Sequence, residues 1–130
     1  MKNRAEFLVE TDILIGHLIQ KNIKEISDLE LAMTKGVCFT TVINSSEMYF
    51  SSWDEKEKHA VDSVMNAVKV LGIHPRYSLN ISEFFNKVAS TRDAMICSLA
   101  KINKLPILTT QINKYKNCGL KIISPKELRG

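Results

Sequence analysis

Cysteine is scarce in this sequence, and its three copies, Cys38, Cys97 and Cys118, are scattered without Cys-x-x-Cys spacing. An odd, scattered set argues against a disulfide framework and against a zinc site. None of the three histidines has a second His or Cys at ligand spacing, so we expect them to be non-catalytic. We expect Cys38 and Cys97 to be small core residues, because free cysteine is among the most buried residue types.

Long hydrophobic runs are also missing. No apolar stretch approaches the roughly eighteen residues that a membrane-spanning helix needs. Near the N-terminus the apolar run is short and is interrupted by Glu10 and Asp12, which is unlike a secretory signal peptide. These absences predict a cytoplasmic protein without a membrane segment.

Apolar residues, in contrast, are plentiful. They make up 45% of 130 residues, which fits one domain with one core, and we expect a single domain over residues 1–130. The net charge of +4 leans toward an anionic partner such as nucleic acid. Several lysines near the C-terminus either contact backbone phosphates or, more economically, form a solvated surface. They are Lys101, Lys104, Lys114, Lys116 and Lys121.

Strand-like and helix-like patterns alternate along most of the chain. β-Branched and aromatic runs predict strands, and apolar residues at helical spacing predict helices. The expected strands are residues 7–9, 37–43, 107–110 and 120–123, with 70–73 as a short strand or a helix end, and the expected helices follow residue 12 and cover 26–33, 54–69 and 92–100. This alternation predicts an α/β fold with a parallel sheet and helices on both faces.

Capping residues refine these boundaries. Thr11 or Asp12 is expected to cap the first helix. Asn44 and Glu47 have the spacing of a capping box, which would make Glu47 a structural residue. Gly36 is expected to end the helix over 26–33 in the left-handed conformation.

Three acids stand near the ends of predicted elements. Asp93 falls in the first turn of the helix over 92–100, where the helix dipole favours an acid, so a purely structural role competes with a functional one. Glu10 and Glu47 lie just after or near strand-like runs, and the ends of parallel strands are where ligand crevices form. A buried carboxylate such as Glu10 needs a cationic partner.

Four blocks of sequence together resemble the PIN domain, the small α/β nuclease fold of VapC-type toxins and of several RNA-processing enzymes. They are residues 9–15 (VETDILI), 41–47 (TVINSSE), 92–100 (RDAMICSLA) and 107–111 (ILTTQ) followed by Tyr115. The third block is the most similar to the family pattern and the first is next. The resemblance implies a three-layer sandwich with a central parallel sheet of four to five strands.

The resemblance also implies a metal-dependent ribonuclease. Glu10, Glu47 and Asp93 would hold Mg²⁺ or Mn²⁺, with Asp12 as a fourth ligand or as a group that orients a metal-bound water. Hard divalent cations prefer oxygen ligands, activate water and neutralise charge on phosphate oxygens. Gln111, which stands at the family's fourth acidic position, or Thr109 beside it, would hydrogen-bond a water or the scissile phosphate.

Two departures from the family pattern keep a second function open. The family has Asp at the place of Glu10, and an acid or Asn at the place of Gln111. The first hypothesis is an RNA-cleaving toxin, inhibited by a small antitoxin protein. The alternative is a PIN-like domain with weakened catalysis that binds RNA or protein. Family likeness further predicts a homodimer. Its interface would include the helix over 54–69 and the aromatic residues before it, Tyr49, Phe50 and Trp53, which by sequence alone fit either a core or a partner surface.

Overall fold

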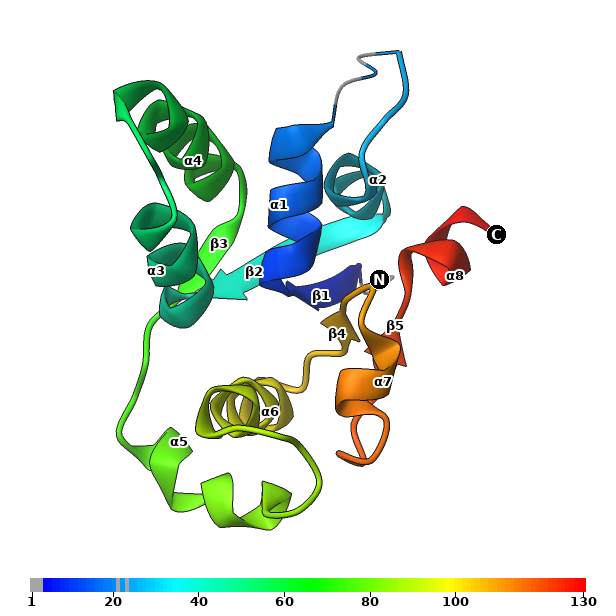
Figure 1. Ribbon diagram of the computed structural model, residues 1–130. Coiled ribbons are helices and arrows are strands. Elements are labelled where there is room, and N and C mark those ends of the chain that lie inside the picture. The colour runs from blue at the N-terminus through cyan, green and yellow to red at the C-terminus, as the bar shows by residue number, and fades with distance from the viewer. Residues whose placement is uncertain (1–3, 21, 23) are drawn as a thin grey trace.

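The computed structural model describes residues 4–20, 22 and 24–130 (Figure 1). Five strands form one sheet in the order β3-β2-β1-β4-β5, and every pair of neighbours is parallel. Their bounds are β1 Ala5–Val9, β2 Gly36–Thr41, β3 Lys69–Leu71, β4 Ile107–Leu108 and β5 Ile122–Ile123. The predicted α/β fold with a central parallel sheet of four to five strands is therefore confirmed.

Helices cover both faces of this sheet (Figure 1). The α-helices are α1 Thr11–Ile19, α2 Asp28–Lys35, α3 Val42–Phe50, α4 Glu55–Ala67, α5 Arg76–Leu79, α6 Thr91–Asn103, α7 Ile112–Tyr115 and α8 Pro125–Arg129, and η1 Ile81–Phe84 is a 3₁₀ helix. Helices α1, α2, α3 and α4 lie on one side of the sheet, and α5, α6 and α7 lie on the other (Figure 1).

Side-chain alternation along the central strand divides the core in two. Phe7 and Val9 of β1 pack with α1, α2 and α4, whereas Leu8 between them packs with α6 and α7. This is the period of two that a strand buried on both faces requires. Cys38 and Cys97 are buried in the two halves of the core, as predicted. No helix within the described residues is long and apolar enough to cross a membrane.

Gly36 has a different role from the predicted one. Its φ of −177° is extended rather than left-handed, and it begins β2 directly after α2. A Cβ atom built at this position would lie 2.1 Å from the carbonyl oxygen of Ala5, its partner in β1. Glycine is therefore needed here for the close approach of two strands.

The first two helices that follow strands begin earlier than the capping analysis predicts. Glu10 is the N-cap of α1, and its side chain accepts a hydrogen bond from the backbone N–H of Thr11, so the prediction of Thr11 or Asp12 as cap is wrong. Helix α3 begins directly after β2 with a capping box between Thr41 and Asn44. The predicted box between Asn44 and Glu47 is wrong, which frees the Glu47 carboxylate for other contacts.

Helix α6 lies against the other face of the sheet and carries the third acid. Ser90 is its N-cap and accepts a hydrogen bond from the backbone N–H of Asp93. Lys104 follows the helix with a φ of 56°, the left-handed conformation that often ends a helix, and the chain then turns into β4.

Candidate active site

The candidate site lies at the carboxyl ends of the central strands. From β1 the chain continues to β2 on one side, whereas β4 pairs with β1 on the other side, so the direction of the sheet connections reverses at β1. Parallel α/β sheets form their ligand crevices at such a reversal. A cleft of about 520 Å³ lies here, and its lining includes Glu10, Asp12, Glu47, Arg92, Asp93, Gln111 and Lys114.

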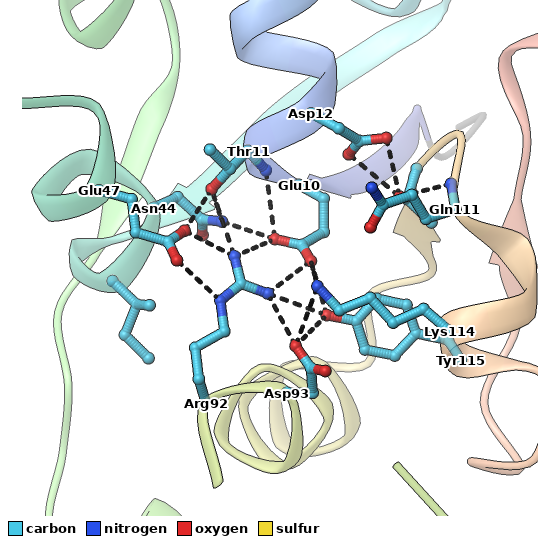
Figure 2. Close-up of polar contacts among 12 residues, drawn as sticks. Glu10, Thr11, Asp12, Asn44, Glu47, Arg92, Asp93, Gln111, Lys114 and Tyr115 are labelled. Atoms are coloured by element: carbon cyan, nitrogen blue, oxygen red, sulfur yellow. Dashed lines mark hydrogen bonds and ion pairs between the residues drawn. The ribbon is translucent and has the colours of Figure 1, made fainter. Parts of the chain in front are cut away.

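Arg92 of α6 is at the centre of this cleft (Figure 2). Its Nη1 and Nη2 atoms donate hydrogen bonds to the two carboxylate oxygens of Glu10, at 2.6 and 2.7 Å. Nη2 and Nε donate to the two oxygens of Glu47, at 2.6 and 3.1 Å. One guanidinium is thus bidentate to two carboxylates at once, an arrangement that matches the planar fork of arginine donors.

Asp93 and Lys114 extend the same cluster. Asp93 Oδ1 accepts a hydrogen bond from Nη1 of Arg92 at 3.1 Å and lies 3.1 Å from the Lys114 ammonium. Lys114 Nζ is also 3.8 Å from Oε2 of Glu10. Three carboxylates therefore face two cations, which leaves these five side chains with a net charge of −1. Glu10 and Asp93 are each 3% exposed, so their charges are compensated by Arg92 and Lys114 rather than by water.

Neutral side chains hold the two glutamates in place. The hydroxyl of Tyr115 donates to Glu10 Oε2 at 2.6 Å, and the Asn44 side-chain amide donates to Glu10 Oε1 at 2.8 Å. Asn44 is fully buried and also donates to the Thr11 hydroxyl, which in turn donates to Glu47 Oε1 at 2.6 Å. This chain of bonds fixes both carboxylates independently of Arg92 (Figure 2).

Asp12 lines the cleft, and its carboxylate is hydrogen-bonded to the segment after β4. Its carboxylate accepts hydrogen bonds from the Thr109 hydroxyl, at 3.0 Å to each oxygen, and from the backbone N–H of Thr110 at 2.7 Å. These contacts join the start of α1 to the segment after β4. The side chain of Gln111 is exposed and lies near Asp12 in Figure 2, while its backbone N–H donates to the Thr109 hydroxyl.

The cluster shifts the proton affinities of its members. Burial alone would raise the pKa of Glu10, but the hydrogen bonds and charge of Arg92, with Tyr115, lower it to about 2. Burial also opposes the charged form of Glu47, yet hydrogen bonds from Arg92 and Thr11 leave its pKa below the ordinary value. Burial and the Glu10 charge raise the pKa of Tyr115, so its hydroxyl remains a donor at neutral pH.

A divalent metal suits these residues in kind but not in their present arrangement. Carboxylate oxygens are the ligands that Mg²⁺ and Mn²⁺ prefer. However, in the part of the chain that the structure describes, no three His, Cys, Asp or Glu side chains are grouped so that one metal ion could be held among them. The carboxylates of Glu10, Glu47 and Asp93 are instead spread around the larger guanidinium of Arg92.

The structure brings the predicted residues Glu10, Glu47 and Asp93 to one point and leaves Asp12 and Gln111 at the side of the cleft. Sequence reasoning did not assign Arg92, Tyr115 or Asn44 to the site. It named Lys114 as one of several lysines that either contact phosphates or form a solvated surface. One signal was available for Arg92, because a cation in the first turn of a helix opposes the helix dipole and calls for an acidic partner.

The structure is thus that of an α/β protein whose parallel sheet has a cluster of acidic side chains at the carboxyl ends of its central strands, where the direction of the connections reverses. A family model described as the PIN domain matches residues 7–113, and the chain belongs to that family. PIN domains are in general nucleases and in general use divalent metal ions. No curated protein matches the chain.

Solved structures of toxin–antitoxin complexes share this fold. A chain of DNA-bound VapBC from Salmonella typhimurium superimposes with a TM-score of 0.78 at 15% identity, covering 93% of this chain and 98% of that one. VapBC2 from Rickettsia felis, bound to a promoter DNA fragment, gives 0.77 at 15% identity, with 92% and 98% covered. A toxin–antitoxin complex from Klebsiella pneumoniae gives 0.75 at 13% identity, with 92% and 97% covered.

Proposed function

We propose that this chain is an endoribonuclease that hydrolyses RNA phosphodiester bonds with the help of Mg²⁺ or Mn²⁺. The observation that carries the proposal is the meeting of Glu10, Glu47 and Asp93, from three separate elements, around a single cation. Three carboxylates at the carboxyl ends of neighbouring strands repel each other unless a positive charge lies among them. Membership in a family of nucleases supports the same function.

Glu10, Glu47 and Asp93 would hold the metal. A bound divalent ion supplies a water that is nucleophilic near neutral pH and neutralises charge on the phosphate oxygens. Tyr115 and Asn44 orient the two oxygens of Glu10, and Thr11 orients Glu47. Lys114, which lines the cleft and is 29% exposed, would pair with an RNA phosphate.

Cleavage of a mixed-sequence RNA by the purified chain tests this function. We expect cleavage with Mn²⁺, its loss when EDTA removes the metal, and a decrease of roughly a hundredfold or more in Asp93→Asn. Asp62→Asn is the matched control, because Asp62 of α4 accepts a hydrogen bond from the Tyr49 hydroxyl of α3 and lies outside the cleft. Cleavage that is absent throughout, or that Asp93→Asn leaves unchanged, contradicts the proposal.

A second function is favoured by the Arg92 contacts. If the guanidinium permanently replaces the metal, the chain is a PIN domain that binds RNA or protein without cutting it. Uncharged Gln111 and the longer Glu10 fit this alternative as well. RNA binding in a filter or gel-shift assay, without cleavage under any metal condition, would favour it over the nuclease.

The partner proposals follow from the structural relatives, which are toxin–antitoxin complexes. We propose that the chain is the toxin of such a pair, acting in the cytoplasm, and that a segment of a small antitoxin fills the cleft. A short neighbouring reading frame for a DNA-binding protein, and rescue of growth when both are expressed, test this pairing. A homodimer is the expected assembly of the chain itself.

A further inference from the structure

The oxygens that a metal would need in this cleft are already in use. Arg92 engages both oxygens of Glu10, both oxygens of Glu47 and Oδ1 of Asp93, at distances from 2.6 to 3.1 Å. The three contacts of 2.6 and 2.7 Å, to Glu10 and Glu47, are as short as strong charge-assisted hydrogen bonds. A divalent ion bound to the same oxygens would have to stand where the guanidinium lies.

We propose that Arg92 is a built-in occupant of the metal position and that a divalent cation binds only when the guanidinium leaves. The inference rests on the nuclease function proposed above and adds a step before it. Coexistence is excluded by charge as well as by space, because the guanidinium keeps its proton at any accessible pH and would repel a divalent cation at contact distance.

Withdrawal of the side chain requires no change in the fold. The Arg92 side chain is 23% exposed and lines the cleft, whereas the side chain of its neighbour Asp93 is only 5% exposed. The guanidinium can therefore move out by rotation of its own side-chain bonds while α6 stays in place. This freedom distinguishes Arg92 from the buried groups around it.

The carboxylates remain positioned after such a movement. Glu10 keeps its bonds from Tyr115 and Asn44, and Glu47 keeps its bond from Thr11. Among the basic side chains that the structure describes, Lys114 alone then remains in contact with Glu10 and Asp93, so the repulsion among the carboxylates favours the entry of a cation with two charges. The same carboxylates can thus bind either of two cations, the guanidinium of Arg92 or a divalent metal ion from solution.

Direct measurement of Mn²⁺ binding tests this competition without reference to activity. Electron paramagnetic resonance of the free aquo ion gives the affinity of the unmodified chain and of Arg92→Gln. We expect Arg92→Gln to bind Mn²⁺ at least about tenfold more tightly. Mn²⁺ should also raise the melting temperature of Arg92→Gln more than that of the unmodified chain, because a tighter ligand stabilises the folded state more.

Arg76→Gln is the matched control, since it removes the same charge from α5, where Arg76 stacks on Tyr77 outside the cleft. Equal Mn²⁺ affinity in the unmodified chain and Arg92→Gln overturns the proposal, whether that affinity is high or low. If Arg92→Gln does not fold, Arg92→Lys replaces it, because one ammonium cannot bridge two glutamates bidentately. Its Mn²⁺ affinity should also exceed that of the unmodified chain, and an unchanged value overturns the proposal.

These results separate the two proposals. Tighter Mn²⁺ binding by Arg92→Gln without RNA cleavage by any variant would support the competition and contradict the nuclease. Metal-dependent RNA cleavage by the unmodified chain, with the same Mn²⁺ affinity in Arg92→Gln, would support the nuclease and contradict the competition.

Discussion

The hydroxyl of Tyr115 donates a 2.6 Å hydrogen bond to Oε2 of Glu10, a residue 105 positions away in the sequence. Tyr115 is fully buried at the end of α7, and Glu10 follows the central strand. The contact therefore links the C-terminal part of the fold to the carboxylate at the centre of the cleft.

Replacing Tyr115 by Phe removes that donor without changing the packing of the ring. We expect the free energy of unfolding to fall by about 1 to 3 kcal/mol, because a buried carboxylate loses one of its hydrogen bonds. Urea denaturation measures the change. Tyr49→Phe is the control, since the Tyr49 hydroxyl bonds Asp62 at a partly exposed position and its loss should cost less. Equal effects of the two variants would contradict the prediction.

Acid should weaken the fold through Glu10. Its pKa of about 2 in the folded protein lies below the unfolded value of 4.5, so its contribution is complete above pH 4.5 and is lost as pH falls toward 2. A difference of this size corresponds to about 3 kcal/mol. Urea denaturation from pH 7 to pH 3 measures the decline. The pH dependence should be smaller in Glu10→Gln, and an identical dependence would contradict the assignment.

Lys104 offers a stability test outside the cleft. It adopts a φ of 56° after α6, a conformation that costs residues with a side chain roughly 1 kcal/mol relative to glycine. We therefore expect Lys104→Gly to raise the free energy of unfolding by up to about 1 kcal/mol. Lys101→Gly, inside α6, should lower it. A decrease in both variants would show that the side chain of Lys104 has a stabilising contact of its own.

The proposed homodimer can be tested at the segment between α3 and α4. Trp53 is 89% exposed there, and large aromatic residues are enriched at protein interfaces. We expect the chain to sediment as a dimer at tens of micromolar and Trp53→Ser to dissociate it. Phe85→Ser is the control, because Phe85 is also exposed but follows η1 on the other side of the sheet. A monomeric unmodified chain contradicts the prediction.

The fold could be predicted because its signals are local. The sequence patterns located four of the five strands and left 70–73, which overlaps β3, open between a strand and a helix end, and β4 and β5 differ from the expected runs only by being shorter. Capping was less reliable, since Thr41 and Asn44 are both suited to begin a helix and lie three residues apart. In the structure Thr41 is the N-cap of α3 and Asn44 lies inside the helix. The Asn44 side-chain amide donates to Glu10, a contact with another part of the chain that local capping rules do not include.

The site could be predicted only in part. Local sequence position was enough to pick out the three acids as candidates. Glu10 and Glu47 stand just after or near predicted strands, and Asp93 stands at the start of a predicted helix. The role of Arg92 depends on a side chain that reaches carboxylates 82 and 45 residues away. No periodicity or spacing encodes such a contact, and the position of Arg92 in the first turn of α6 indicates that it needs an acidic partner without indicating which one.

The pairing of β1 with β4 has a consequence for biosynthesis. Glu10 is made early and Tyr115 late, and Leu8 reaches its register partner Ile107 only after most of the chain exists. Parallel strands far apart in sequence pair late, because the chain between them must first be ordered. A nascent polypeptide that ends before β4 therefore lacks Gln111, Lys114 and Tyr115, so the cleft around Glu10 can form only after this C-terminal segment has been made.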